Sequence, residues 1–216
     1  MQRLSFTHDD AVTALADQIT SFVAAAEAFD DLELLDPSRC RGWSRMDLVV
    51  HVRCGLQEMA LGAAARSQSE ADTDAASYWR VHPGADDTDP VDGILWLRRV
   101  AGAHTRPTRA VQHLKDVALG TIATIRTTSP GVVEFQGRRM DSGDFLGTWV
   151  VELAVHQLDL DAAGPPPPGT AWTRRTIEAL AGTRLPEELG DLDAVLAGLG
   201  RTGADHELGA AFPITL

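Results

Sequence analysis

The segment V-V-E-L-A-V-H-Q-L-D-L at residues 150–160 constrains the fold more than any other part of the chain. Its apolar residues lie nearly all round a helix, which predicts a helix that is buried on most sides. Glu152 and His156 are four residues apart, so they project from the same face of that helix. Because buried charged groups are costly unless they are paired or bound to metal, this segment predicts a site as well as a core helix.

His51, far upstream in M-D-L-V-V-H-V, completes a candidate set of metal ligands with Glu152 and His156. Two histidines and one carboxylate suit a catalytic divalent metal that keeps one position open for water or substrate. Asp159 lies near the same helix face and could orient a ligand without binding the ion. The alternatives are a Glu–His pair on a helix surface and a buried histidine satisfied by a hydrogen bond in the core. The shared apolar surroundings of these residues favour the metal site.

Four long helical segments are predicted from apolar residues at helical spacing. Thr7 or Asp9 can cap the first, and Ser44 caps the second with Asp47 at its third position. The third is expected to be a single helix that is kinked near Pro107. Four such helices predict an all-α four-helix bundle, in which sites are built between facing helices. The predicted helices cover about 9–29, 44–63, 90–127 and 142–164.

Two shorter features surround the fourth helix. The segment G-V-V-E-F-Q-G-R-R-M before it predicts a short β-hairpin that turns at Gln136–Gly137. The four prolines at 165–168 after it cannot continue a helix, and two short helices are predicted beyond them, over about 171–182 and 186–199. We therefore expect a metal-binding bundle over residues 1–164 and a short helical C-terminal extension over residues 165–216.

Composition narrows the partners and the compartment. The 216 residues have a formal net charge of −12 and a pI of about 4.9, which argues against nucleic acid and anionic membranes as partners. The sequence contains no apolar run of membrane-spanning length and no signal-peptide pattern, so a cytoplasmic location is expected. Cys40 and Cys54 are predicted to be unjoined, because Cys40 lies in the loop before the second helix and Cys54 lies some three turns along that helix. Cys54, three residues after His51, is a minor candidate for a metal ligand or a reactive thiol.

Two other pairs of residues are noteworthy. Tyr78 and Trp79 stand in a polar, acidic segment, and they either anchor this loop against the bundle or form a wall over the metal site. His104 and His113 are nine residues apart, half a turn out of phase on one helix. They are therefore not expected to face a common site.

The segments R-G-W-S-R-M-D-L-V-V-H-V and E-L-A-V-H-Q-L-D-L resemble the mycothiol-dependent maleylpyruvate isomerase family of the DinB-like superfamily. The resemblance covers about residues 1–164. It implies a four-helix bundle that holds a divalent metal, usually zinc, through His51, Glu152 and His156. It also implies that Asp159 matches the aspartate of the family's E-x-x-x-H-x-x-D pattern and that the tryptophan of Gly42–Trp43 is mainly structural.

The resemblance ends after Pro165. Family members continue into an α/β domain that helps to bind substrate and thiol, whereas the remaining residues here predict helices. Arg174, Arg175 and Arg184 are the candidates in this region for binding an anionic substrate, and surface arginines are the simpler interpretation.

The resemblance implies a metal-dependent enzyme that uses a low-molecular-weight thiol, mycothiol, on a small electrophilic substrate. Coordination to zinc would make the thiolate available at neutral pH, either for isomerisation or for thiol transfer. Two other interpretations stay open on the sequence. One is a non-catalytic metal- or ligand-binding regulatory bundle, and the other is direct metal-assisted hydrolysis.

Overall fold

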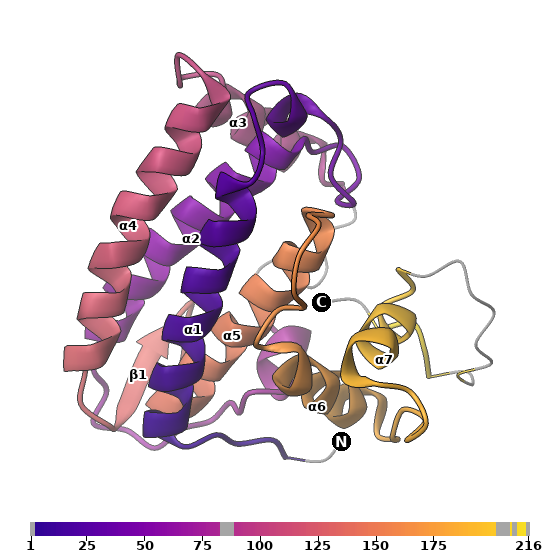
Figure 1. Cartoon of the computed structure of the whole chain (residues 1–216). Coiled ribbons are helices and arrows are strands. Elements are labelled where there is room, and N and C mark those ends of the chain that lie inside the picture. The colour runs from indigo at the N-terminus through magenta and orange to yellow at the C-terminus, as the bar shows by residue number, and fades with distance from the viewer. Residues whose placement is uncertain (1–2, 83–88, 202–207, 209–210, 215–216) are drawn as a thin grey trace.

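Four long helices form the body of the molecule in the computed structural model, which describes residues 3–82, 89–201, 208 and 211–214 (Figure 1). Helix α1 packs against α4 and α5, and α2 packs mainly against α4. The all-α fold with one small hairpin confirms the predicted class. The bundle helices are α1 (His8–Glu27), α2 (Arg45–Ala64), α4 (Pro107–Thr127) and α5 (Ser142–Asp159).

The first two helices begin where the sequence predicts. Thr7 caps α1, its hydroxyl accepting a hydrogen bond from the backbone N–H of Asp10 at 3.3 Å. Ser44 and Asp47 form a reciprocal capping box at the start of α2, so two otherwise unpaired N–H groups are satisfied. From these starts the apolar positions fall on the inner faces. Leu15, Ile19 and Phe22 are buried in the core.

The third predicted helix is in fact two. Helix α3 (Val91–Ala101) ends in a turn, and α4 begins at Pro107. The prediction of one kinked helix was wrong because proline suits the first turn of a helix, where its missing N–H leaves no hydrogen bond unmade. The turn also resets the helical phase. His104 and His113 consequently lie with ring centroids 5.8 Å apart, contrary to the expectation that they could not share a site.

Strands β1 (Val132–Phe135) and β2 (Arg138–Asp141) form the predicted antiparallel hairpin. Gln136 and Gly137 both have positive φ, at 52° and 73°, which is the geometry that fits the right-handed twist of a two-residue hairpin. The hairpin packs on α2 and α5, and its second strand runs directly into α5.

The C-terminal extension contains α6 (Thr170–Ala181) and α7 (Asp191–Gly198), so its predicted helical character is confirmed, although α7 begins later than expected. Helix α5 also ends earlier, at Asp159. The extension shares the core of the bundle, because Ile177 of α6 and Val195 of α7 are fully buried with it. Two short 3-10 helices, η1 (Glu33–Leu35) and η2 (Ser77–Arg80), lie in the connections.

Within the described part of the chain, none of the helices is both long enough and apolar enough to cross a membrane.

Candidate metal centre

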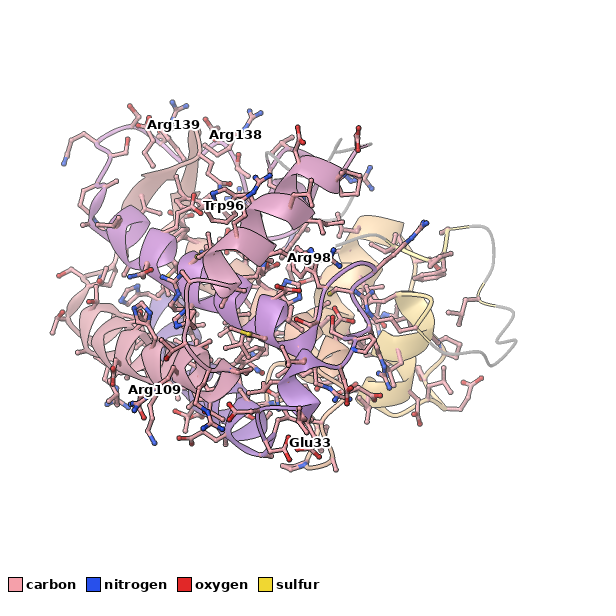
Figure 2. All side chains as sticks on the ribbon, turned by 90° about the horizontal axis from the view of Figure 1, so that it is seen from above. Glu33, Trp96, Arg98, Arg109, Arg138 and Arg139 are labelled. Atoms are coloured by element: carbon pink, nitrogen blue, oxygen red, sulfur yellow. The ribbon has the colours of Figure 1, made fainter. Side chains whose placement is uncertain are left out.

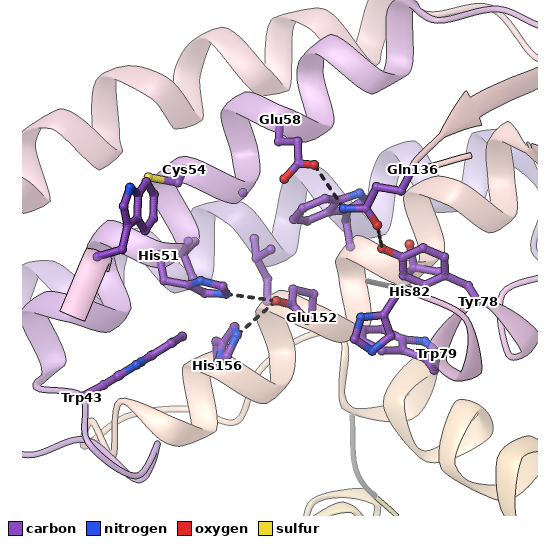
Figure 3. Close-up of a pocket in the computed structure, with 16 residues that line it drawn as sticks. Trp43, His51, Cys54, Glu58, Tyr78, Trp79, His82, Gln136, Glu152 and His156 are labelled. Atoms are coloured by element: carbon purple, nitrogen blue, oxygen red, sulfur yellow. Dashed lines mark hydrogen bonds and ion pairs between the residues drawn. The ribbon is translucent and has the colours of Figure 1, made fainter. Parts of the chain in front are cut away.

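The structure brings His51, Glu152 and His156 to one point between α2 and α5 (Figure 3). The Oε1 atom of Glu152 lies 3.3 Å from Nε2 of His51 and 3.1 Å from Nε2 of His156. One ligand atom from each residue lies within 4.8 Å of the other two. Zinc–ligand bonds of roughly 2.0–2.1 Å imply a separation of about 3.3 Å between neighbouring ligand atoms of a tetrahedron. The donor types and spacings therefore fit a divalent ion with little movement.

The protonation of Glu152 and of His156 depends on the charges and hydrogen bonds around them. Burial disfavours ionisation of Glu152, but the charge of His156 and hydrogen bonds with both histidines outweigh it and hold the Glu152 pKa well below its usual range. Burial likewise disfavours protonation of His156, while Glu152, Asp159 and Cys40 together raise the pKa of His156 well above its usual value. The carboxylate is thus ionised, as a cation site requires, and a divalent ion would displace the proton that His156 otherwise binds.

Asp159 lies behind His156, at the position that the sequence predicts for an orienting carboxylate. It is completely buried, and its Oδ2 lies 3.6 Å from Nδ1 of His156, the ring nitrogen that faces away from Glu152. A carboxylate on that nitrogen favours the tautomer that leaves Nε2 free to bind a metal. Burial opposes ionisation of Asp159, but hydrogen bonds from His156 and Arg201 keep its pKa well below its usual range.

Arg201 is a site residue that the sequence analysis missed. Its guanidinium contacts both oxygens of Asp159, through Nε at 2.6 Å and a terminal nitrogen at 3.0 Å. The residue follows α7, 42 positions beyond Asp159. Nothing in the local sequence distinguishes it, because nearly every basic residue of this chain is an arginine. The pairing of Arg201 with Asp159 becomes apparent only from the packing of the extension against the bundle.

The two cysteines occupy different parts of the site, and both are free, as predicted. The Sγ atom of Cys40 lies 3.3 Å from Oδ2 of Asp159 and 3.9 Å from Nδ1 of His156, so these three residues form a second convergent group. Arg201 already neutralises Asp159 there and would repel a cation, which makes the His51 group the better metal site. No pattern in the sequence indicated that Cys40 lies near His156. Cys54 faces the cavity but belongs to neither group found among the described residues.

The candidate ligands open into a cavity of about 460 Å³ with aromatic walls. Trp43 packs on His51 with ring centroids 4.8 Å apart. Trp149 lies on α5 against Gly55 of α2, where an added Cβ would come within 2.9 Å of the indole ring. Glycine at that position therefore lets the Trp149 ring approach the backbone of α2 closely. The side chains that line this cavity come from α2, α3, α5, the hairpin and the loops before α2 and α3.

Tyr78 and Trp79 satisfy both interpretations of their role. They are more than 90% buried on the bundle, which anchors the loop, and they also line the cavity (Figure 3). The Tyr78 hydroxyl donates to Oε1 of Gln136 at 2.9 Å, and Nε2 of Gln136 donates to Glu58 at 3.1 Å. This chain of hydrogen bonds links the loop, the hairpin and α2. Sequence reasoning missed Gln136 and Glu58, which lie in an exposed turn and on an exposed helix face.

The arginines considered as anion-binding candidates make contacts away from the cavity. Arg174 pairs with Glu178 and Asp191 at 3.1 Å each, and Arg184 pairs with a neighbouring glutamate at the surface. Arg175 lies over the ring of Phe6. None of the three is among the described residues that line the cavity.

A helical bundle with a histidine on α2 facing a glutamate and a histidine on α5 places this chain in the DinB-like class of proteins. Residues 13–161 match the sequence profile described as "Mycothiol maleylpyruvate isomerase N-terminal domain". The match covers more than half of the chain, so the chain belongs to this family.

Two solved structures are similar to this fold. One is a histidine-to-alanine mutant of the mycothiol-dependent maleylpyruvate isomerase, with a TM-score of 0.56 and 18% sequence identity. The other is the mycothiol-dependent maleylpyruvate isomerase itself, with a TM-score of 0.53 and 16% identity. Each comparison covers 81% of this chain and 68% of the other. At these identities the likeness concerns the fold alone. No curated protein sequence matches this chain significantly.

Proposed function

We propose that this protein is a metal-dependent enzyme that uses a low-molecular-weight thiol, mycothiol, on a small electrophile. His51, Glu152 and His156 would hold the ion, most suitably zinc. The observation that carries this proposal is the meeting of their three ligand atoms within 4.8 Å at the wall of an open cavity. Membership of the mycothiol maleylpyruvate isomerase family supports the identity of the thiol. The cytoplasmic location stays a prediction from the sequence.

A bound divalent ion would supply a lowered pKa for the thiol of the cosubstrate, so that thiolate is present at neutral pH. The surrounding residues prepare the site for this. Asp159 would orient His156, Trp43 packs on the ring of His51, and the aromatic walls would shield a bound thiolate from water. Addition of the thiol to a conjugated double bond, followed by rotation and elimination, would isomerise the substrate. Release of the adduct would instead make the protein a thiol transferase.

The proposal is tested by metal content and thiol-dependent turnover of the purified protein. Conversion of a panel of conjugated electrophiles, to the isomer or to the thiol adduct, is followed with and without mycothiol in the presence of zinc. His51→Gln is expected to abolish both zinc retention and turnover. His113→Gln, an exposed histidine outside the cavity lining, is the matched control and should leave both unchanged. Zinc binding without thiol-dependent turnover would favour the regulatory alternative, and thiol-independent turnover would favour hydrolysis.

A further inference from the structure

We infer that the cavity beside His51 and Glu152 selects an uncharged, flat, apolar electrophile and disfavours substrates that carry carboxylates. This inference rests on the proposed function, because it names the substrate class of the same site. Four of the five tryptophans in the chain line the cavity together with Tyr78. The tryptophans are Trp43, Trp79, Trp96 and Trp149.

Aromatic walls of this kind favour flat apolar ligands. Indole and phenol rings contribute large contact areas and stack on other π systems in offset or edge-on geometry. Trp43 packs on the ring of His51, and Trp149 lines the cavity from α5. Trp96 reaches the cavity from α3 with 54% of its surface exposed. A planar conjugated molecule that enters past Trp96 can therefore reach the candidate ligands while remaining in contact with aromatic surface.

Glu58 gives the cavity a negative charge at its edge. Its side chain is exposed, and Oε1 is held by the hydrogen bond from Gln136, which Tyr78 in turn orients (Figure 3). The carboxylate is thereby kept at the cavity wall instead of turning freely into solvent. An anionic ligand would approach this like charge while losing part of its hydration, so its binding is penalised twice.

The described lysine and arginine side chains do not line the cavity. Arg98 of α3 donates to the backbone oxygen of Gly42 at 2.6 Å, and Arg139 of β2 pairs with Asp72 at 2.8 Å (Figure 2). Among the described residues that line the cavity there is no lysine and no arginine. The stretches of sequence outside the described ranges contain neither residue type. Arginine, the usual partner for carboxylate recognition, is therefore not part of this wall.

The test compares two ligands that share ring and double bond and differ in charge, methyl cinnamate and cinnamate. Binding to the full-length protein is measured by calorimetry, both with zinc and after removal of metal by chelator. The ester is expected to bind the metal-free protein at least ten-fold more tightly than the carboxylate. Equal or tighter binding of cinnamate, or no binding of the ester at millimolar concentration, would overturn the inference.

Two variants test whether the Glu58 carboxylate causes the preference for the ester. Glu58→Gln should reduce the preference for the ester at least three-fold, because it removes the like charge and keeps the shape. Glu188→Gln removes an equally exposed charge in the extension, outside the cavity lining, and should leave the preference unchanged. An unchanged preference in Glu58→Gln would overturn the role given to that carboxylate. Because binding to metal-free protein needs neither thiol nor turnover, a protein that prefers the ester but lacks thiol-dependent activity would refute only the proposed function.

Discussion

Arg201 offers a direct test of whether the C-terminal extension serves the candidate metal centre. Replacing it with methionine keeps a long unbranched side chain and removes the charge. Asp159 then loses its contacts at 2.6 and 3.0 Å. Among the residues that the structure describes, it keeps the Cys40 thiol and Nδ1 of His156 as side-chain partners within 4 Å. The carboxylate is completely buried, so water cannot replace the guanidinium without local opening.

We expect Arg201→Met to lower both the stability of the fold and the affinity for zinc. Removing one partner of a buried ion pair costs about 3–5 kcal/mol. The side chain of Arg201 is 24% exposed, so we expect the lower end of that range, about 3 kcal/mol. For a chain of this length this corresponds to a fall in Tm of roughly 6–12 °C. Zinc affinity should fall about 10–100-fold, because Asp159 would no longer be fixed against His156.

The assays separate the role in metal binding from stability. Zinc affinity is measured by competition with a chromophoric chelator, and Tm is measured in excess chelator. Arg174→Met is the matched control, because Arg174 is also a paired arginine of the extension but touches no candidate ligand. It should lower Tm without changing zinc affinity. Adding Arg201→Met to the Asp159→Asn variant should lower the Tm by less than Arg201→Met lowers it in the wild-type protein. Wild-type zinc affinity in Arg201→Met, or an equal loss in Arg174→Met, would refute the reasoning.

Two further predictions concern the carboxylates Glu152 and Asp144. Glu152→Gln should lower zinc content at least ten-fold in elemental analysis, and it should also lower the Tm in chelator, because the ionised carboxylate that His51 and His156 stabilise is lost. Retention of zinc at the wild-type level would make Glu152 a structural residue only. Burial raises the pKa of Asp144 to about 6, so the folded state holds one more proton than the unfolded state between about pH 4 and 6. The free energy of unfolding therefore falls by up to about 3 kcal/mol as the pH rises through that window. Urea unfolding of Asp144→Asn should therefore show its advantage over wild type at pH 7.5 and not at pH 4.5; an equal difference at both pH values would contradict this.

The parts of the fold that were predictable are those determined by neighbouring residues. The capping box of Ser44 and Asp47 and the turn at Gln136–Gly137 depend on a few adjacent positions, and the structure has both. The spacing of Glu152 and His156 shows in the same way that they share a helix face. The separation of α3 from α4 was not predictable in this way, because Pro107 is compatible with either a kink or a helix start.

The missed residues share one property, which is that only tertiary packing brings them to the site. Cys40 precedes α2 and Arg201 follows α7, yet both contact Asp159 at the end of α5. Local patterns contain no information about such contacts, since any arginine of the extension was an equally good candidate. The division of the chain into a bundle and an extension at residue 164 stays a prediction. A bundle that ends there would keep the three proposed ligands and lose the guanidinium that neutralises Asp159. We therefore expect residues 165–216 to be part of the proposed metal centre as well as of the core.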